Sequence, residues 1–258
     1  MLQKERLALI LSTLEEKKAL SLKEVIELTQ SSRDTARRDI VKLAENNLIE
    51  RTYGGISLPR SFKRLDDYLK RSEEGAHVKQ QLAAAASRLI EEEDVVFLDV
   101  STTIRFIPTY LRPFSQLFSV TNSIDIADQL LRNPSGTARM LGGNLDAEKR
   151  CVLGTRPLAE LEDYNFDLAF LSVVGIDEAG VHYAYEDDID MKKKIRQQTR
   201  RLVLVADQSK LGRSHHFNVF SLEEIDSLVT NGKLPETLSR KLAEAHVDVI
   251  YTKEASHD

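Results

Sequence analysis

The sequence predicts an α/β effector domain with a mostly parallel sheet, preceded by a small N-terminal winged helix-turn-helix domain. Three observations predict this. Seven short apolar segments follow residue 94, with helical patterns between most of them, and such segments form parallel sheets that are covered on both faces. The first 58 residues contain three helical patterns and a hairpin pattern. The charge also changes: residues 1–71 carry 15 Lys and Arg against 11 Asp and Glu, a formal +4, whereas residues 72–258 carry 21 against 30, a formal −9.

We divide the chain into three parts on this basis. A length of 258 residues suits one large domain or two ordinary ones. Residues 1–58 form the head, residues 76–258 form the body, and residues 59–75 are expected to be a linker helix. The linker is a charged segment, SFKRLDDYLKRSEE, placed between Pro59 and Gly75. Any signal between head and body must pass through it.

The head begins with two helical patterns. Residues 4–15 place leucine and isoleucine side chains on one face, and Ser21 with Glu24 forms a capping box before a second helix. Residues 30–32 make a turn, and a third, arginine-rich helix follows. Its apolar stripe consists of Ala36, Ile40, Leu43 and Ala44, and we expect it to end near Asn46 and Asn47.

The arginine-rich helix and the hairpin after it predict a DNA-binding surface. Residues 48–52 indicate a strand, residues 53–55 a tight turn, and residues 56–58 a second strand. A winged helix-turn-helix places such a helix in the major groove, with its N-terminal residues reading base edges. A basic head joined to an acidic body is the charge distribution expected if only the head contacts the phosphates of DNA. The candidate DNA contacts are Ser32, Arg33, Thr35, Arg37, Arg38, Arg51 and Tyr53. Arg38 could instead pair with Asp34, four residues before it.

The body is expected to alternate helices and strands. Helices are predicted at 77–90, after the first strand, from residue 123, and at 188–200. The seven predicted strands are 95–100, 117–120, 138–141, 167–174, 202–207, 227–230 and 247–251.

Polar clusters follow four of these strands, at Ser101–Thr103, 121–123, 142–144 and 207–210. Ligands of open α/β sheets bind beyond the carboxyl ends of the strands, and hydroxyl and backbone N–H groups there form anion sites. The sequence therefore predicts a small polar anion, most simply a phosphorylated metabolite, with Lys210 adding charge. Purely structural roles are the alternatives: 121–123 can be a helix cap, Gly142-Gly143 a turn, and 192–194 a partly solvated helix face. We expect Arg105, on a following helix, to face solvent.

Several classes of site and location are disfavoured by the sequence. No apolar run approaches the roughly 20 residues of a membrane span. The first residues lack the apolar centre of a signal peptide, and Cys151 is the single cysteine, so we expect a cytoplasmic protein without an internal disulfide. No Cys and His set has metal-ligand spacing, and we expect neither a metal nor another cofactor.

Over its whole length the chain resembles the deoxyribose-operon repressor (DeoR) family of bacterial transcription regulators. In the head the resemblance rests on residues 32–40, SRDTARRDI, and 51–55, RTYGG. In the body it rests on residues 99–103, 120–123, 141–143, 175–177 and 206–210. One difference falls in the phosphate loop, where the family usually has Gly and this chain has Ser101.

The resemblance implies a repressor of a sugar-utilisation operon that binds operator DNA as a dimer or tetramer and is released by a phosphorylated sugar. The implied body fold is that of ribose-5-phosphate isomerase. The implied effector-binding residues are Asp99, Ser101, Thr102, Thr103, Asn122, Asp177, Lys192, Asp207 and Lys210. Ser101–Thr103 and Lys210 would hold the phosphate, while Asn122, Asp177 and Asp207 would meet sugar hydroxyls.

The isomerase likeness also raises an alternative function, a sugar-phosphate isomerase carrying a DNA-binding head. Similar enzymes use an Asp-Gly-x-Asp-Glu loop and a Glu-Lys pair. Here the loop begins with Val174 and the pair reads Met191-Lys192, so two carboxylates are missing, although Asp190 is adjacent. Because isomerisation needs a general base beside the substrate carbon, the sequence favours binding without turnover.

Overall fold

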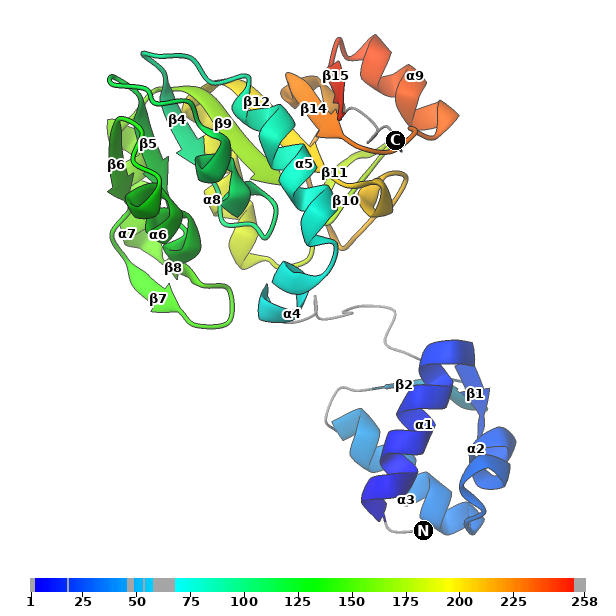
Figure 1. The fold of residues 1–258 in the computed structure, drawn as a ribbon. Helices are drawn as coiled ribbons and strands as arrows, with labels where there is room; N and C mark the ends of the chain where they lie inside the picture. The colour runs from blue at the N-terminus through cyan, green and yellow to red at the C-terminus, as the bar shows by residue number, and fades with distance from the viewer. Residues whose placement is uncertain (1–2, 18, 46–48, 53, 58–67, 253–258) are drawn as a thin grey trace, which may run out of the picture. The chain divides into compact units, whose positions relative to one another are not determined.

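The computed structural model describes residues 3–17, 19–45, 49–52, 54–57 and 68–252 (Figure 1). The chain divides into two compact units, Met1–Lys63 and Arg64–Asp258. The first unit contains the predicted head and the second contains the predicted body.

The head is a three-helix domain with a small antiparallel sheet. Its elements are α1 (Gln3–Lys17), β1 (Ala19–Ser21), α2 (Leu22–Thr29), α3 (Arg33–Glu45), β2 (Glu50–Thr52) and β3 (Gly55–Ser57). The strands pair in the order β1-β3-β2. Ser21 and Glu24 form the capping box predicted for α2. Strand β1 is absent from the predicted elements, because three residues show no periodicity. The predicted helix end at Asn46 and Asn47 lies outside the described residues.

The head has its own core and one buried charge. Ile10, Leu14, Leu43 and Ile56 are among its fully buried side chains. At the edge of the α3 stripe, next to Ala36 and Leu43, Asp39 is fully buried and accepts hydrogen bonds from α1, including one of 2.7 Å from Arg6 Nε. The arginine-rich helix is therefore fixed to the head by both apolar packing and an ion pair.

The body is built on a seven-stranded sheet in which every pair is parallel. The strand order is β15-β14-β12-β9-β4-β5-β6. The strands are β4 (Val95–Leu98), β5 (Phe118–Thr121), β6 (Thr137–Met140), β9 (Phe166–Ser172), β12 (Thr199–Ala206), β14 (Ser227–Thr230) and β15 (Asp248–Tyr251). Each corresponds to one of the seven predicted segments, so the α/β class with a parallel sheet is confirmed.

Two apolar layers cover the faces of the sheet. One layer contains the packed sides of α5 (Ala76–Ser87), the 3₁₀ helix η1 (Ile104–Tyr110) and α6 (Ile124–Arg132). The other contains α8 (Asp187–Gln197), α9 (Glu236–Glu244) and a small antiparallel sheet of β10 (Gly175–Asp177), β11 (Gly180–Tyr183) and β13 (Phe217–Phe220). Phe97 belongs to the second layer and its neighbours Val96 and Leu98 to the first, as the alternation of a strand requires.

The remaining elements are short: α4 (Tyr68–Glu73), the hairpin β7 (Asn144–Asp146) and β8 (Cys151–Leu153), α7 (Thr155–Glu160), and the 3₁₀ turns η2 (Leu161–Asp163), η3 (Gln208–Lys210) and η4 (Leu222–Glu224). Helix α4 is the described part of the expected linker helix. The helix expected after the first strand is a 3₁₀ helix with Pro108 inside it. Cys151 is buried and is a free thiol. Within the described ranges, no helix is long and apolar enough to cross a membrane.

Candidate functional site

The first candidate site is the exposed side of α3 in the head. Ser32 caps this helix, since its hydroxyl accepts a hydrogen bond of 3.3 Å from the backbone N–H of Thr35 and also lies 2.9 Å from the Thr35 hydroxyl. Arg33, Arg37 and Arg38 follow and are all exposed. No ion pair joins Arg38 to Asp34, both of which the structure describes. The charge of Arg38 is therefore available to an external anion.

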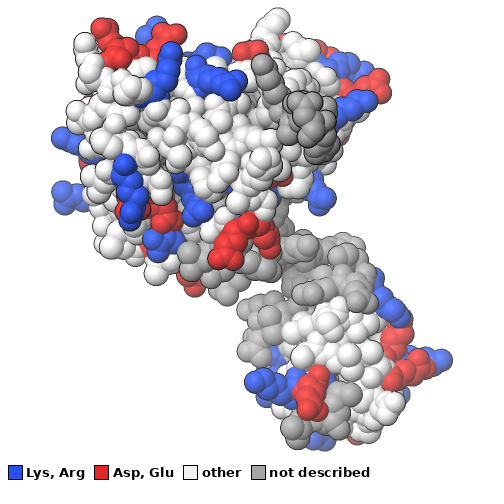
Figure 2. Space-filling view, viewed as in Figure 1, with Lys and Arg blue, Asp and Glu red and all other residues white. Residues whose placement is uncertain are grey.

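A groove runs between this helix, the start of α2 and the hairpin. It is lined by Leu22, Lys23, Ile26, Arg33, Arg37, Ile40, Val41, Arg51, Thr52, Gly54 and Gly55. Lys23, Arg33, Arg37 and Arg51 give it four positive charges, and Lys and Arg of the head are drawn in blue in Figure 2. The carbonyl of Gly54 accepts a hydrogen bond of 3.1 Å from the backbone N–H of Leu22, which ties the hairpin turn to α2. Tyr53 lies outside the described residues.

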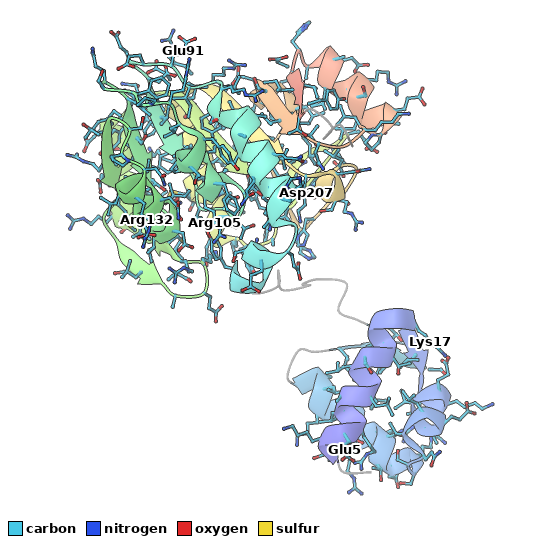
Figure 3. The ribbon with its side chains drawn as sticks, in the orientation of Figure 1. Glu5, Lys17, Glu91, Arg105, Arg132 and Asp207 are labelled. Carbon is cyan, nitrogen blue, oxygen red and sulfur yellow. The ribbon has the colours of Figure 1, made fainter. Side chains whose placement is uncertain are left out.

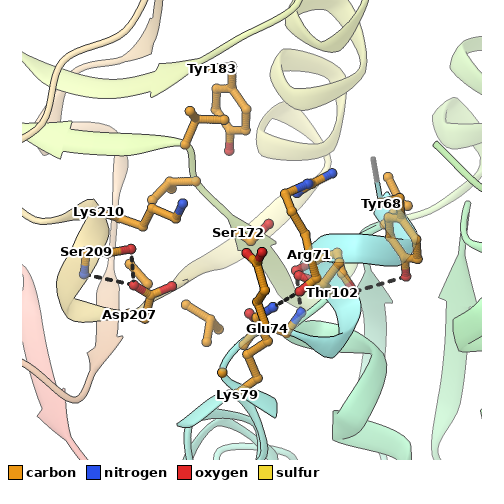
Figure 4. Close-up of a pocket in the computed structure, with 18 of the residues that line it drawn as sticks. Tyr68, Arg71, Glu74, Lys79, Thr102, Ser172, Tyr183, Asp207, Ser209 and Lys210 are labelled. Atoms are coloured by element: carbon orange, nitrogen blue, oxygen red, sulfur yellow. Dashed lines mark hydrogen bonds between the residues drawn. The ribbon is translucent and has the colours of Figure 1, made fainter. Parts of the chain in front are cut away.

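The second candidate site is a cavity of about 410 Å³ in the body, at the carboxyl ends of β4, β9 and β12 (Figure 4). Helix α4 and the start of α5 form one wall, and α8 contributes to another. The residues with polar side chains in the lining are Tyr68, Arg71, Glu74, Lys79, Ser101, Thr102, Thr103, Lys149, Ser172, Tyr183, Tyr185, Asp188, Lys192, Asp207, Gln208, Ser209, Lys210 and Asn231.

The loop after β4 presents three hydroxyl groups to this cavity. The Ser101 hydroxyl accepts hydrogen bonds from the backbone N–H groups of Thr103 and Ile104, at 3.0 and 3.3 Å, and so fixes the loop at the start of η1. The hydroxyls of Thr102 and Thr103 form no hydrogen bond with another described residue. The carbonyl of Ser101 lies 3.5 Å from the Tyr68 hydroxyl, which connects the loop to α4. Two hydroxyl donors are therefore available to a ligand oxygen.

Cations gather beside this loop. Arg71, Lys79 and Lys210 line the cavity, and Lys79 donates a hydrogen bond to the backbone carbonyl of Arg71. Burial lowers the pKa of Lys79, an effect that Asp207 opposes. Arg105 follows the loop on η1, with its guanidinium carbon 4.7 Å from the centre of the Phe106 ring (Figure 3). Its Nε is buried and has no hydrogen-bond partner among the described residues.

On the α8 side, the charges are paired. Lys192 is 4% exposed and donates to the carboxylate of Asp99, which also accepts a hydrogen bond of 3.0 Å from Asn122. Burial by itself lowers the pKa of Lys192, but attraction to Asp99 and Asp188 outweighs it and leaves that pKa raised. Lys149 Nζ lies 3.2 Å from a carboxylate oxygen of Asp188. Lys149 also lies 4.5 Å from the centre of the Tyr185 ring.

Comparison with known protein families identifies both units. Residues 74–232 match the model of the DeoR C terminal sensor domain, and residues 6–62 match that of the DeoR-like helix-turn-helix domain. The chain belongs to the DeoR family.

Its relatives are similar over nearly their whole length. The HTH-type transcriptional repressor GlcR of Bacillus subtilis is 38% identical over 91% of this chain and 90% of its own length. The HTH-type transcriptional regulator GlpR of Haloferax volcanii is 31% identical, over 97% and 98% of the two chains. The Escherichia coli glycerol-3-phosphate regulon repressor is 27% identical, over 89% and 91%.

Two solved structures resemble parts of the fold weakly. Ribose 5-phosphate isomerase A of Methanocaldococcus jannaschii has a TM-score of 0.38 and 16% identity, over 54% of this chain and 55% of that one. A Chaetomium thermophilum eIF2B-beta2-delta2 complex has a TM-score of 0.46 and 11% identity, over 85% and 69%.

In the DeoR sensor domain, the structure brings together most of the effector residues named from sequence. Ser101, Thr102, Thr103, Lys192, Asp207 and Lys210 line one cavity. Asn122 and Asp177 do not line it: Asn122 is fixed beneath the loop by bonds to Asp99 and the Val100 N–H, and Asp177 lies 2.8 Å from His182 Nε2. Asp99 does not line the cavity either, but it is paired with Lys192, which does.

Residues 192–194 are a partly solvated helix face, as the structural alternative predicts: Lys193 is exposed, whereas Lys192 is buried because it neutralises the buried Asp99. One expectation about a cation is wrong. Arg105 is half-buried rather than solvent-facing, because η1 turns its side chain onto Phe106. Sequence reasoning also missed Arg71, Lys79 and Lys149 of the cavity wall. The charged residues of the 59–75 segment can be recognised in the sequence, but their spacing does not indicate a ligand-binding site.

Proposed function

We propose that this chain is a transcriptional repressor of a sugar-utilisation operon, and that a phosphorylated sugar bound in the body cavity relieves its binding to operator DNA. Both units match the domain models of a family of regulators, and the relative GlcR is named a repressor. The observation that supports the effector most directly is the cavity itself, where free Thr102 and Thr103 hydroxyls lie with Lys210 and Arg71.

The chemistry of the cavity suits a phosphate group. Phosphate carries a charge of about −1.5 to −2 near neutral pH and has three strong acceptor oxygens. Hydroxyl donors and cations provide the matching groups, and bonds between ionised partners are stronger than neutral ones. Carboxylates and tyrosine hydroxyls elsewhere in the lining can bind the hydroxyls of a sugar.

The head supports the DNA-binding part of the proposal. Arg33 and Arg37 are one helical turn apart on the exposed side of α3, and Arg51 faces the same groove from β2. Arginine can bind guanine through two hydrogen bonds in the major groove, and hairpin cations can neutralise backbone phosphates.

Helix α4 offers a route from effector to head. It lies in the chain immediately after the 58–67 segment that leads from the head, and it supplies Tyr68 and Arg71 to the cavity wall. A ligand changes DNA affinity only if it binds the DNA-competent and DNA-incompetent arrangements with different affinity. A bound phosphate could contact Arg71, or it could change the contact between the Ser101 carbonyl and the Tyr68 hydroxyl. Either change would give the two arrangements different affinities for the ligand.

The test is the double substitution T102A/T103A in the full chain. Operator affinity should be unchanged, while release by sugar phosphates should be lost. Thr237→Ala is the control, because Thr237 is exposed on α9 and outside the cavity lining, and this variant should respond as the wild type does. Normal release of the double variant from DNA would mean that the effector binds elsewhere.

We further propose that the body does not turn its ligand over. Met191 occupies the position of the enzymes' base and is buried, while Asp190 is exposed and outside the cavity lining. Asp188 does line it, but it is paired with Lys149. Incubation with aldose and ketose phosphates, followed by mass-resolved chromatography, should show no interconversion. Conversion that Asp188→Asn abolishes would instead establish an isomerase.

We also propose that the protein works in the cytoplasm as a dimer or tetramer on repeated operator sites. Dimeric helix-turn-helix proteins bind half-sites separated by one helical turn of DNA or a multiple of it. Analytical ultracentrifugation with and without operator DNA should show an even number of subunits. A monomer that binds a single half-site would contradict this assembly.

A further inference from the structure

The groove of the head contains one apolar side chain that the packing of the head does not require. Four large aliphatic residues line this groove: Leu22, Ile26, Ile40 and Val41. The first three belong to the apolar core of the head or pack against it. Val41 takes no part in that core and is 39% exposed, although it lies well inside α3. Its side chain is therefore available to a molecule that binds in the groove.

Val41 lies in a row with two arginines. Arg33, Arg37 and Val41 follow one another at intervals of four residues along α3, and all three line the groove. Side chains four residues apart lie on the same face of a helix, about 6 Å apart along its axis. The face of α3 that presents two guanidinium groups to a ligand therefore also presents the two methyl groups of a valine.

The charge of the groove indicates what binds there. Lys23 from α2 and Arg51 from β2 face the same groove, and no Asp or Glu of the described residues lines it. A protein partner that covered Val41 would have to bury or pair the four cations of the groove, and burying an unpaired charge is costly. Double-stranded DNA offers phosphates to the cations and base edges to the helix, so it complements this face as a whole.

The chemistry of a valine side chain restricts which base it can recognise. Valine has neither a donor nor an acceptor in its side chain, so it cannot form hydrogen bonds with the polar edges of bases. Thymine carries a methyl group at C5, and this group projects into the major groove, where apolar side chains contact it.

We infer that Val41 is a specificity-determining residue that recognises a thymine of the operator through the C5-methyl group of that base. The inference rests on the proposed function, in which α3 enters the major groove, and it adds a base that the helix reads without a hydrogen bond.

The experiment first removes the methyl group from the DNA. The operator is a duplex that the wild-type full chain selects from a random pool, and each thymine in it is replaced in turn by deoxyuridine, which pairs with adenine but lacks the C5-methyl group. Affinities are measured by fluorescence anisotropy at one salt concentration, because contacts with phosphate depend on salt. We expect at least one thymine whose replacement weakens binding by the wild type about fourfold, the effect of burying one CH₂-sized group.

Val41→Ala then identifies the side chain that contacts this methyl group. The variant should bind the intact operator about fourfold more weakly than the wild type, and replacing the sensitive thymine should weaken its binding no further. At other thymines it should keep the wild-type sensitivity. Alanine favours a helix more than valine does, and Val41 is exposed, so the loss cannot come from a less stable α3. Leu131→Ala is the control, because it shortens an exposed aliphatic side chain on α6 of the body, and it should keep the wild-type pattern.

The outcomes separate this inference from the proposed function. Equal losses for the wild type and Val41→Ala at every deoxyuridine position would overturn the inference, and so would a wild type that senses no thymine methyl group. Wild-type affinity of Val41→Ala for the intact operator would also overturn it and leave Val41 as an exposed side chain without a role in recognition. A wild-type chain that selects no duplex from the pool would overturn the proposed function, and this inference with it.

Discussion

The hydroxyl oxygen of Ser101 lies 3.0 Å from the backbone nitrogen of Thr103 and accepts its hydrogen bond. The N–H of Ile104 donates to the same oxygen. Backbone N–H groups in such a loop are the groups that commonly bind phosphate. In the free protein, therefore, a serine hydroxyl occupies two donors that an incoming anion could use. The φ angle of Ser101 is not positive, so serine fits this position without backbone strain.

Removing this hydroxyl should strengthen phosphate binding. In Ser101→Gly the two N–H groups lose their internal partner, and a net hydrogen bond is worth roughly 0.5–1.5 kcal/mol, or about 2- to 12-fold in affinity. Calorimetric titration with inorganic phosphate measures the change. Ser101→Ala separates the loss of the hydroxyl from the greater backbone freedom of glycine, because it also frees the N–H groups but keeps a Cβ. Weaker binding by both variants would show that the Ser101 hydroxyl itself holds the ligand.

Arg37→Ala should weaken specific operator binding by roughly 1–3 kcal/mol, because an arginine that reads a guanine contributes this much discrimination. Lys42→Ala provides a control on the same helix, since Lys42 lies outside the groove and its Nζ bonds to Gln3 at 3.0 Å. Both variants can be compared by fluorescence anisotropy on an operator selected from random duplexes. Equal affinities for Arg37→Ala and the wild type would show that α3 docks differently.

The sheet could be predicted from sequence because parallel strands are buried on both faces. Segments such as VVFL and LVLV are continuously apolar, so they stand out without any knowledge of tertiary contacts. The small sheet of β10, β11 and β13 could not be predicted in this way. Its strands have three or four residues, too few to show a periodicity, and one of its two strand pairs joins β11 to a distant segment, β13.

Only some of the residues that line the candidate cavity could be predicted from the sequence. Ser101–Thr103 and Lys210 directly follow apolar strands, so the rule for strand ends finds them. Arg71 and Lys79 come from helices before the sheet begins, and only the packing of α4 and α5 on it brings them to the cavity. Which lysine of the 192–194 segment is buried could not be predicted, because charge alone does not reveal that the partner of Lys192, Asp99, lies 93 residues away.

Asp39→Asn should make the head less stable at neutral pH and less sensitive to acid. Burial alone raises the pKa of Asp39, but hydrogen bonds from Arg6 and Gln3 outweigh it and leave the pKa lowered. A carboxylate with a lowered folded-state pKa stabilises the fold above its unfolded pKa of about 3.9, and this contribution disappears as pH falls through the folded value. Calorimetric melts of the full chain from about pH 7 to pH 3 should show a smaller acid-induced decrease for the variant. Asp34→Asn, exposed on the same helix, should melt like the wild type.

Lys79 should give effector binding an alkaline limit. Burial lowers the pKa of Lys79 from its ordinary value of 10.5, and a bound phosphate favours the charged ammonium form. When Lys79 is neutral in the free protein, binding must therefore be accompanied by uptake of a proton, and affinity falls as pH rises through that lowered pKa. The decrease should begin at lower pH than an ordinary lysine would cause.

Lys79→Arg identifies the group responsible, because arginine keeps its charge throughout this range. Titration of a sugar monophosphate between neutral and alkaline pH should show an early loss of affinity in the wild type and a later one in the variant. Lys233→Arg is the control, since Lys233 is exposed and outside the cavity lining. Identical pH profiles for wild type and Lys79→Arg would assign the alkaline limit to another cation and place the phosphate away from α5.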